Sequence, residues 1–575
     1  MRERLHDQLQ AALRALLDTA GDAGPLPDFA LEVPRNSEHG DFACNAPMLL
    51  AKRLRQPPRA IAEGLLAAVG DAGGLIQRAE VAGPGFVNFW LAGERWHELL
   101  RRVLELGPRY GHSKAGGATR VQVEFVSANP TGPLTLGHGR QAVLGDAIAR
   151  LLQATGHDVT REYYFNDGGR QMRVLGQSVR ARYLEQQGRA AAPPVEAFDT
   201  PEEDWPGEIG GLPVVFPRDG YRGAYISEIA ADLREERGDE LPDESDLFRE
   251  AAETRIMAEI RASLAALRIE FDVFTNEKDL YEQGRLDEAV AELQAKGLVY
   301  ERDGATWFDA TKLGLERDRV LVRSTGEPTY LLPDIAYHQQ KFRRGFERVI
   351  DVQGADHIEQ FPYVRAAAAA LGCPSECIEL VLHQFVTLSQ GGQQMKQSTR
   401  RANYVTVDEL LGMVGSDVFR FFMIQRKADG HLDFNLDLAV DTDWKKNPAY
   451  YVQYAHARTH GIERQAREQG IAIPGAHDVE TEPLRLPEEI EILKKIAEFP
   501  DMLERAAASR EPHHIAYYAR ELAGLWNPYV QDRTRHRILS DDAALTSARL
   551  GLTLAVRAVV ANALTLLGVD TPEQM

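Results

Sequence analysis

Three residues of this 575-residue chain stand out for their chemistry: Gly137, His138 and Gly139. They separate a predicted buried strand at 121–126 from a predicted helix whose apolar residues recur at helical spacing over 143–152. In an α/β sheet, the crevice at such a turn binds ligands, and the N–H groups of the helix start favour phosphate. The two glycines would let a phosphate approach the backbone, and His138 could donate a hydrogen bond or carry a proton. The same turn could also simply connect two elements.

The elements around this turn define three regions. Strands and helices alternate from about residue 113 to 440, which indicates a parallel α/β sheet with an insertion near 175–285. Residues 1–112 combine helix-like segments with a strand in which Phe86, Asn88 and Trp90 alternate, and residues 441–575 are predicted to be all helical. In that last region, one helix should begin at Pro487, with an apolar face formed by Ile492, Ile496, Phe499 and Leu503.

Composition indicates a soluble globular protein, with 44% hydrophobic and 26% charged residues. No apolar run looks long enough to span a bilayer, and the charged N-terminus lacks a signal-peptide core, so we expect a cytoplasmic protein without a membrane partner. The three cysteines fit a reducing compartment, and Cys373 with Cys377 lacks the further ligands of a zinc site. A net charge of −20 argues only mildly against a nucleic-acid partner, because local basic clusters matter more.

Several blocks, in order, resemble the class I arginyl-tRNA synthetases over the full chain. LTLGHGR at 134–140 resembles the HIGH signature, and MKQSTRR at 395–401 resembles a degenerate KMSKS loop. The segments 38–52 and 83–89 resemble an N-terminal tRNA-elbow domain, and 447–458 resembles a helical anticodon-binding domain. The resemblance implies a multidomain α/β fold: a Rossmann-like catalytic domain, an α+β N-terminal domain and an all-α C-terminal bundle.

The resemblance also implies an ATP site. His138, Lys396 and Arg400 would act on the phosphates as charge develops, and Thr135 stands where the family has the first histidine of its signature. A threonine hydroxyl can donate a hydrogen bond but carries no charge near neutral pH. The residues implied to bind ATP are Thr135, Gly137, His138, Asp356, His357, Lys396 and Ser398.

Five residues fall where the family binds arginine: Glu124, Asn129, Tyr330, Asp334 and Gln353. A guanidinium stays charged and has five N–H donors, so its burial requires a carboxylate and filled hydrogen bonds. Two acids and a phenol make a suitable set. Taken alone, each residue has a simpler explanation: Glu124 as a surface acid, Asp334 as a helix N-cap, Tyr330 as a packed side chain and Asn129 as a turn residue.

Aromatic and basic residues at both ends of the chain are candidates for RNA contact. The resemblance implies that Phe86 and Asn88 meet the tRNA elbow, and that Tyr450, Tyr454 and Arg458 lie in the anticodon-binding region. Stacking surfaces beside cations are typical of single-stranded RNA recognition. Tyrosines at helical spacing are also common in protein cores.

The implied reaction joins L-arginine to tRNA(Arg) through an arginyl-adenylate. ATP would enter with Mg²⁺ as a substrate complex, with no tightly bound cofactor and no metal site on the protein. The resemblance implies a monomer that activates arginine only with tRNA bound. Two alternatives remain: a synthetase for another amino acid, which the acids Glu124 and Asp334 disfavour, and a tRNA-binding protein without catalysis, supported by Thr135 and the degenerate loop.

Overall fold

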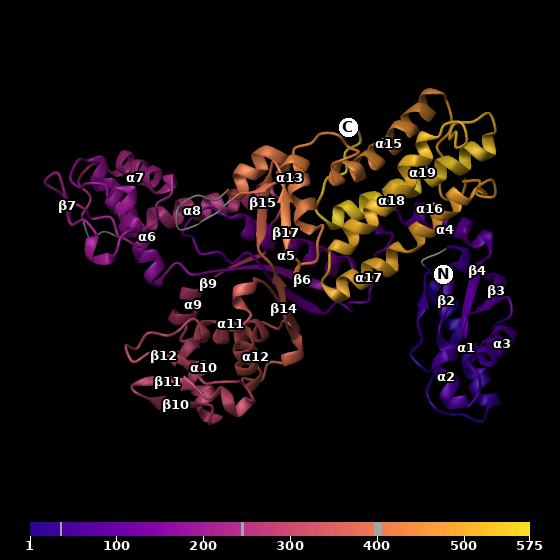
Figure 1. Ribbon diagram of the computed structural model, residues 1–575, viewed down its shortest axis with the longest axis horizontal. Coiled ribbons are helices and arrows are strands. Elements are labelled where there is room, and N and C mark those ends of the chain that lie inside the picture. Colours follow the sequence, from indigo (N-terminus) through magenta and orange to yellow (C-terminus); the bar gives the residue numbers. More distant parts are fainter. Residues whose placement is uncertain (35–36, 243–245, 396–404) are drawn as a thin grey trace.

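The computed structural model describes residues 1–34, 37–242, 246–395 and 405–575. Figure 1 shows an elongated molecule with a sheet and its helices in the middle. The N-terminal domain and the C-terminal helices lie toward one end, and the segment 166–272 extends toward the other end. The combination of a parallel sheet, an α+β domain and an all-α bundle confirms the predicted fold class.

The central sheet is parallel throughout, with the strand order β14-β13-β5-β6-β9. Its strands are Arg120–Glu124 (β5), Asp158–Phe165 (β6), Val273–Asn276 (β9), Arg348–Gly354 (β13) and Ile378–His383 (β14). The chain first adds β6 and β9 on one side of β5, and later places β13 and β14 on the other side. The neighbouring carboxyl ends of β5 and β13 therefore form the topological switch point, where open α/β sheets bind ligands.

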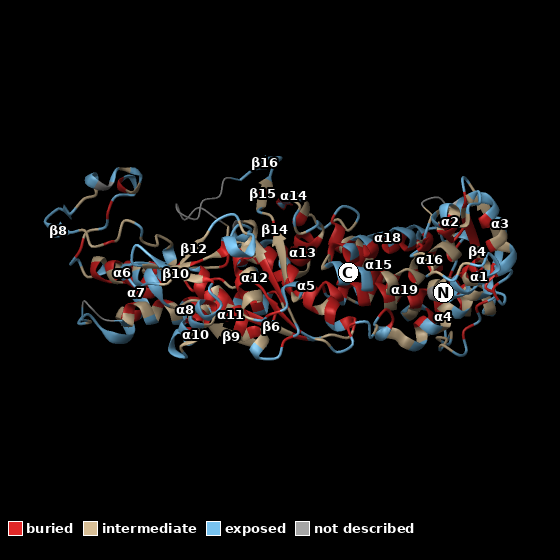
Figure 2. Cartoon of the chain, turned by 90° about the horizontal axis from the view of Figure 1, so that it is seen from below, coloured by how far each residue is buried: buried red, intermediate tan, exposed pale blue. Residues whose placement is uncertain are grey.

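Helix α5, Leu136–Ala154, follows β5 and is buried along most of its length, which confirms the predicted helix (Figure 2). A Cβ atom at Gly139 would lie 2.6 Å from the ring of Phe419 and 3.0 Å from Val407, both on helix α13, Val407–Ile424. Gly139 therefore permits this close helix packing, and the expectation that it also makes room for a phosphate remains a prediction. At Gly137 a Cβ atom would meet only the Thr135 hydroxyl, at 3.7 Å.

Two segments interrupt the sheet. The first, 166–272, contains α6 (Gly169–Gln186), a small hairpin of β7 (Glu208–Ile209) and β8 (Leu212–Pro213), α7 (Ala224–Arg237) and α8 (Leu247–Ala266). The second contains α9 (Glu277–Glu282), α10 (Arg285–Ala295), the antiparallel sheet of β10 (Val299–Arg302), β11 (Ala305–Phe308) and β12 (Arg319–Val322), and α11 (Leu331–Arg343). Helix α12, Phe361–Ala370, then connects β13 to β14 and packs against α11.

A further small sheet lies beyond the central one, with order β16-β15-β17. It comprises β15 (Val386–Gln390), β16 (Gln393–Gln394) and β17 (Leu432–Asn435), followed by α14 (Leu436–Ala439). Arg140, which is fully buried near the start of α5, donates to the carbonyls of Gln384, Lys427 and Gly430 at 2.7, 2.9 and 3.0 Å. This arginine fixes the chain around the small sheet to the first turn of α5.

The N-terminal domain contains a four-stranded antiparallel sheet of order β1-β2-β4-β3. Its elements are α1 (Arg2–Thr19), β1 (Leu31–Glu32), β2 (Phe42–Cys44), α2 (Ala46–Leu54), α3 (Pro58–Val69), β3 (Ile76–Ala82), β4 (Phe86–Leu91) and α4 (Gly93–Leu106). Strand β4 confirms the predicted alternation: Val87, Phe89 and Leu91 are buried in the core, and the residues between them lie on the other face.

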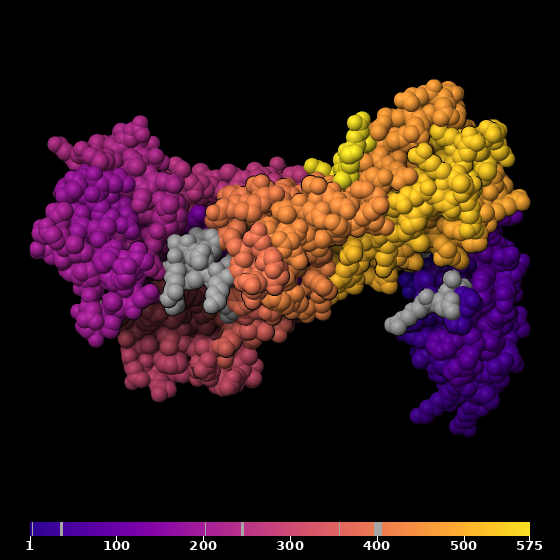
Figure 3. Space-filling view, turned by 45° about the horizontal axis from the view of Figure 1, so that its top comes forward, coloured from indigo at the N-terminus to yellow at the C-terminus, as the bar shows by residue number. Residues whose placement is uncertain are grey.

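The C-terminal region is a bundle of α15 (Pro448–Glu468), α16 (Pro487–Ala497), α17 (Phe499–Ser509), α18 (His513–Gln531) and α19 (Ala543–Leu566). Pro487 begins a helix as predicted, but that helix ends at Ala497. Phe499 and Leu503 belong to a second helix, because Pro500 in its first turn has no N–H to continue the hydrogen bonding of the first. In Figure 3 this bundle (orange to yellow) lies between the N-terminal domain (indigo) and the rest of the molecule.

Helix α19 is long and apolar enough to cross a membrane by length and composition, contrary to the expectation that no such run exists. In its most apolar window, 61% of the residues are buried inside the protein. The helix packs against α15, α18 and α4. Core helices that are covered on all sides by other helices have the same apolar character, so this composition is weak evidence for a membrane.

A buried ion cluster joins the sheet region to the end of the bundle. Asp146 accepts from Arg150 at 2.7 Å and from Arg161 at 3.3 Å, and it also pairs with the fully buried Arg420 of α13. Arg420 donates in addition to the carbonyl oxygens of Leu567, at 2.9 Å, and Leu267, at 2.7 Å. The members of this Asp146 cluster are Asp146, Arg150, Arg161 and Arg420.

Candidate active site

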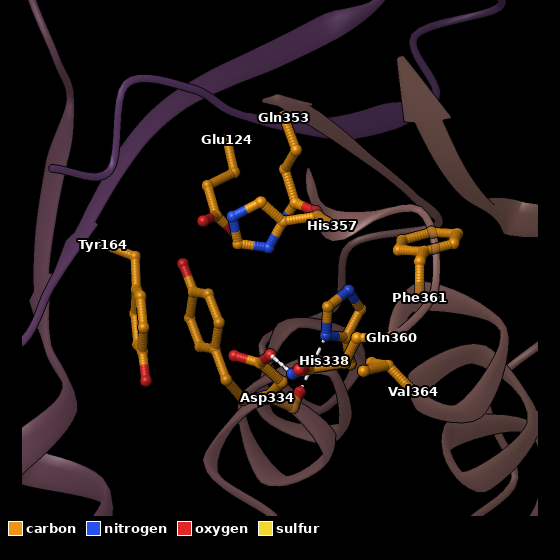
Figure 4. Close-up of a pocket in the computed structure, with 10 residues that line it drawn as sticks. Glu124, Tyr164, Asp334, His338, Gln353, His357, Gln360, Phe361 and Val364 are labelled. Carbon is orange, nitrogen blue, oxygen red and sulfur yellow. Dashed lines mark hydrogen bonds between the residues drawn. The ribbon is translucent and has the colours of Figure 1, made fainter. Parts of the chain in front are cut away.

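An acidic pocket lies at the switch point, beside the carboxyl ends of β5 and β13 (Figure 4). Glu124 is the last residue of β5, and Gln353 lies near the end of β13. Asp334 and His338 reach the pocket from α11. The complete lining is Glu124, Tyr164, Asp334, Tyr337, His338, Gln353, His357, Gln360, Phe361 and Val364. The pocket is therefore lined mainly by polar side chains, and its lining includes no residue of the turn at 137–139.

Asp334 is the acid whose charge is least compensated in this pocket. The side-chain amide of Gln360 donates to its carboxylate at 2.6 Å (Figure 4), and no described lysine or arginine lies within ion-pair distance. Burial raises the pKa of Asp334 to about 7, with Glu124 and Asp351 adding to the rise and His338 opposing it. A cation that entered the pocket would favour the ionised carboxylate.

Lys341 provides an internal cation beneath the pocket. Its ammonium is 0% exposed and lies 2.6 Å from Oε2 of Glu124 and 2.7 Å from Oδ1 of Asp351. Burial disfavours the ammonium, but the two carboxylates hold the pKa of Lys341 above its usual range. Glu124 and Asp351 are paired residues of adjacent strands β5 and β13, so the register of the sheet brings the two acids side by side.

His338 connects the internal ion pairs to Asp334. Its Nε2 lies 2.7 Å from Oδ2 of Asp351, and its Nδ1 lies 2.8 Å from the backbone carbonyl oxygen of Asp334. A neutral imidazole has a single N–H, so both bonds form together only in the imidazolium. Burial favours the neutral form of Asp351, but Lys341 and His338 hold the pKa of that carboxyl below its usual range. We call Glu124, Asp334, His338, Lys341 and Asp351 the pocket cluster.

The loop that follows β5 has a strained backbone beside the pocket. Val126 and Ser127 have φ angles of 68° and 41°, a region that a β-branched valine rarely adopts. The hydroxyl of Ser127 donates to Oε1 of Glu124 at 2.9 Å and accepts from the N–H of Tyr164 at 3.2 Å. Burial raises the pKa of Glu124, whereas Lys341 opposes that rise. The loop therefore orients the Glu124 carboxylate through Oε1, while Lys341 binds Oε2.

Two further acids surround the pocket. Burial disfavours the charged form of Glu162, but bidentate bonds from Arg344 at 2.6 and 2.7 Å hold its pKa at about 2. Glu277, in contrast, accepts only neutral donors among the described residues: the Tyr164 hydroxyl at 3.0 Å, the Asn166 amide at 2.6 Å and the Tyr281 hydroxyl at 3.3 Å. Burial raises the pKa of Glu277. Glu277 is thus a second acid near Asp334 without a described cation partner.

The structure brings together three of the five predicted arginine-binding residues. Glu124, Asp334 and Gln353 line the pocket. Asn129 lies outside it, where its side-chain oxygen accepts from the N–H of Asn166 and its amide donates to Gln171. Tyr330 stands immediately before α11 and is 68% exposed, so its phenol does not line the pocket in this conformation. His357, which was predicted on the ATP side, lines the same pocket as Gln353.

The turn that the sequence predicts to bind phosphate lies at the start of α5. Thr135 is the N-cap residue, and its backbone N–H donates to Nδ1 of His138 at 3.2 Å. The neutral imidazole therefore carries its proton on Nε2. Thr135 also forms an isolated β-bridge with Thr406, the N-cap of α13, and the N–H of Val407 donates to the carbonyl of Leu134 at 2.9 Å. The starts of α5 and α13 are thereby fixed side by side.

Four predicted ATP-site or catalytic side chains cannot be placed. Lys396, Ser398 and Arg400 lie outside the described residues, as does the side chain of Asp356. The backbone of Asp356 lies in a short 3-10 helix, Ala355–His357, directly after β13. The predictions for these residues remain predictions.

The predicted RNA contacts lie on two distant regions. Asn88 on β4 is buried and Phe86 is partly exposed on the same face of the sheet. On α15, Tyr454 stacks on Trp444 with ring centroids 3.8 Å apart, and Arg458 donates to the Tyr454 hydroxyl at 3.0 Å. Tyr450 and Tyr454 are partly buried, so neither belongs wholly to the core. The Trp444–Tyr454 stack offers an aromatic surface beside a cation.

Sequence reasoning missed several residues of the site. His338 and Lys341 follow Asp334 at spacings of four and seven, which places all three on one face of α11. Polar residues at that spacing in a largely buried helix were the available signal. No comparable signal marked Asp351, which sits in an apolar strand, or Trp444, which precedes its helix.

The geometry defines what the pocket can hold. Its cluster contains three acids, one lysine and one histidine, and the Asp334 carboxylate has no described cation partner, so a further positive charge would be stabilised there. The lining also offers amide, imidazole and phenol groups for directional hydrogen bonds. The pocket therefore suits a cationic small molecule. The start of α5 follows β5 in the chain, and its N–H groups favour an anion.

Comparison with family models first gives the class. The model for the class I (R) tRNA synthetase catalytic domain matches residues 100–198 and 229–423. The model for the arginyl-tRNA synthetase N-terminal domain matches residues 3–91, and the DALR anticodon-binding domain model matches residues 452–575. The fold and the site are thus those of a class I tRNA synthetase.

Relatives that match over their full length identify the family within this class. The chain is 44% identical to an arginine–tRNA ligase of Desulfotalea psychrophila and 46% identical to one of Salinibacter ruber, over 99% of this chain and all of each relative. The arginyl-tRNA synthetase structure from Thermus thermophilus matches with a TM-score of 0.73 and 26% identity over the whole of both chains. This chain belongs to the arginyl-tRNA synthetase family.

Proposed function

We propose that this chain attaches L-arginine to tRNA(Arg) through an arginyl-adenylate, with release of AMP and pyrophosphate. The observation that carries the proposal is the pocket cluster, in which the carboxylate of Asp334 has no described cation partner. Arginine supplies that charge in a planar group that stays protonated, and its five donors match the surrounding acceptors. Family membership supports the same reaction.

We assign the guanidinium to Asp334, because this acid lies in the pocket without a described cation partner. Glu277 adds a second acid near it. A buried acceptor set of this kind rejects ligands that cannot pair with it, by roughly 10⁴-fold or more. The other residues proposed to bind arginine are Glu124, Asn129, Tyr330 and Gln353. Tyr330 would have to turn from its exposed position toward the ligand.

In the first step, the arginine carboxylate attacks the α-phosphate of ATP and pyrophosphate leaves. This reaction depends on positioning and on stabilising charge rather than on covalent catalysis. We assign the triphosphate and ribose to the α5 start, with His138 as a donor through Nε2. Lys396 and Arg400 would stabilise the leaving pyrophosphate. Further ATP contacts are assigned to Thr135, Gly137, Asp356, His357 and Ser398, with Mg²⁺ entering as part of the ATP substrate complex.

In the second step, the 2′-hydroxyl of the terminal tRNA ribose attacks the activated carbonyl, as resemblance to class I enzymes implies. We assign elbow contacts to Phe86 and Asn88, and anticodon-loop contacts to Tyr450, Tyr454 and Arg458. The Trp444–Tyr454 stack supports an RNA-binding role for the start of α15, because aromatic rings beside cations can stack on unpaired bases. We further propose that the protein acts as a monomer in the cytoplasm, without a membrane partner.

The test is ATP–pyrophosphate exchange with arginine, measured with and without tRNA(Arg). Exchange only with tRNA is expected and would indicate a site completed by RNA. Exchange without tRNA would support the enzymatic activity but contradict the requirement for bound tRNA. No exchange and no charging in either condition would favour a tRNA-binding protein without catalysis.

The phosphate side can be tested separately with His138→Ala. Loss of a donor aimed at the developing charge should slow exchange on the order of 10²-fold, while arginine binding stays unchanged. His477→Ala is a matched control, because that imidazole is exposed in the bundle far along the chain. Near-normal exchange by His138→Ala would refute the role of this histidine.

A further inference from the structure

The fully buried Lys341 has no direct part in the reaction described above. Its ammonium is enclosed beneath the pocket lining rather than in it. It contacts Glu124 at 2.6 Å, Asp351 at 2.7 Å and the face of the Tyr337 ring at 4.4 Å. Removing a lysine from water this completely is unfavourable unless its partners are charged and well placed. The buried charge of Lys341 therefore calls for a functional explanation.

The sheet register creates the need for this cation. Glu124 and Asp351 are direct neighbours on β5 and β13, and both are buried. Two like charges side by side in a buried site cannot both ionise readily, and one of them takes up a proton. The ammonium of Lys341 contacts one oxygen of each acid, so it allows both to stay charged.

The geometry also fixes where the Glu124 carboxylate points. Oε2 accepts from Lys341 at 2.6 Å, and Oε1 accepts from the Ser127 hydroxyl at 2.9 Å. Both bonds hold the carboxylate while it lines the pocket (Figure 4). A protonated Glu124 would turn one of these acceptors into a donor facing another donor.

We propose that Lys341 is a positioning residue for arginine: its ammonium keeps Glu124 and Asp351 ionised together, so that Glu124 presents a fixed, charged acceptor to the substrate. Lys341 itself does not touch the substrate. This inference rests on the proposed function, because it assumes that arginine occupies the pocket.

The other charged groups around Lys341 are accounted for. From its own helix come His338, which bonds Asp351, and Arg344, which pairs with Glu162. The facing strands contribute Glu124 and Asp351, which contact Lys341, and Glu162, which accepts from the Tyr337 hydroxyl. Lys341 is therefore the single buried ammonium that both Glu124 and Asp351 contact within the described part of the chain.

The test uses the full-length protein with Lys341→Met, which keeps the length of the side chain and removes its charge. Arginine binding is measured by titration calorimetry, and kcat/KM for arginine is measured across pH. We expect arginine binding at neutral pH to weaken about tenfold, the equivalent of a one-unit shift in one ionisation. The acid limb of the profile should move to higher pH, with arginine binding recovering as pH rises, and KM for ATP should stay near its original value.

A second variant, Lys341→Met with Asp351→Asn, separates charge from packing. It removes the cation together with the neighbouring like charge, so Glu124 should ionise more easily than in Lys341→Met alone. We expect its acid limb to lie between those of the single variant and the unaltered protein. The control is Arg344→Met, which removes a cation from the same helix whose partner, Glu162, does not line the pocket.

The outcomes are distinct. A Lys341→Met protein with unchanged arginine binding and an unchanged acid limb overturns the proposal, as does a double variant whose limb is shifted as far as the single one. If Lys341→Met does not fold, the double variant decides: an acid limb identical to that of the unaltered protein overturns the proposal. Failure of the unaltered protein to bind or charge arginine would instead overturn the proposed function.

Discussion

The pocket cluster and the Asp146 cluster are both buried groups of charges, but they are balanced differently. The Asp146 cluster has one acid and three arginines, and the excess donors of Arg420 are taken up by the carbonyls of Leu567 and Leu267. The pocket cluster has three acids against Lys341 and His338. Asp334 receives only an amide donor there among the described residues.

The difference separates a structural cluster from a binding site. Donors and acceptors that are all satisfied within the chain fix two regions together and leave nothing for a ligand. A buried cluster that lacks one counter-charge destabilises the protein without ligand, and a ligand that carries the missing charge is stabilised when it binds there. Burial alone raises the pKa of a carboxyl group, because it disfavours the charged form. Arginine partners lower the pKa of Asp146, whereas burial without a cation raises the pKa of Asp334.

The largest effect that we expect is on the structural cluster. Arg420→Met should destabilise the contact between the sheet region and the bundle by about 3–5 kcal/mol, because it breaks a buried pair and leaves two carbonyls without donors. The measurement is thermal denaturation together with limited proteolysis near the chain end. Arg150→Met is the control, with an expected cost of less than about 1 kcal/mol for a partly exposed partner of the same acid. A similar melting temperature for Arg420→Met and the unaltered protein would contradict the structural role.

The pocket cluster should respond in function instead of stability. Asp334→Asn keeps the shape and still accepts from Gln360, but it should cost at least roughly 2 kcal/mol of arginine binding, because the buried guanidinium loses its counter-ion. Arginine KM and calorimetric affinity measure the loss. Asp287→Asn, an exposed acid on α10, is the matched control. An unchanged arginine KM in Asp334→Asn would contradict the role of Asp334 in arginine binding.

Local patterns in the sequence predicted much of the frame. Helical periodicity over 143–152 located α5, and the alternation around Asn88 located β4. The resemblance named Glu124 and Asp334 before the pocket was known. These features depend on short-range order, in which the spacing of apolar residues decides which face is buried.

The partners of those acids could not be predicted, because they depend on contacts between distant parts of the chain. Lys341 meets Glu124 across 217 positions, and Asp351 becomes its neighbour only because β13 pairs with β5. The side-chain direction of Tyr330 also depends on where α11 begins, which turn composition alone does not fix. Register and strand order, rather than local propensity, determine the charge balance of the site.

The smallest effect that we expect is a pH dependence of arginine binding at the pocket cluster, which the Asp146 cluster should not share. Burial raises the pKa of Asp334 to about 7 in the empty pocket, so below about pH 7 the carboxyl is protonated. Arginine binds the ionised form, so it must displace that proton, and its affinity should fall by up to about tenfold for each pH unit below 7 and level off above it. Titration calorimetry in buffers of different ionisation enthalpy should detect close to one proton released per arginine at about pH 6.

The same change in pH should leave the Asp146 cluster unaffected. Burial opposes the ionisation of Asp146, but three guanidinium groups hold its pKa below the usual range, so it stays ionised through this window. Arg420→Met and the unaltered protein should therefore differ in melting temperature by the same amount at about pH 6 and pH 8. In Asp334→Asn the proton release should disappear. If arginine affinity in the unaltered protein does not depend on pH, Asp334 is already ionised in the empty pocket. The proposed difference in charge balance between the two clusters would then be wrong.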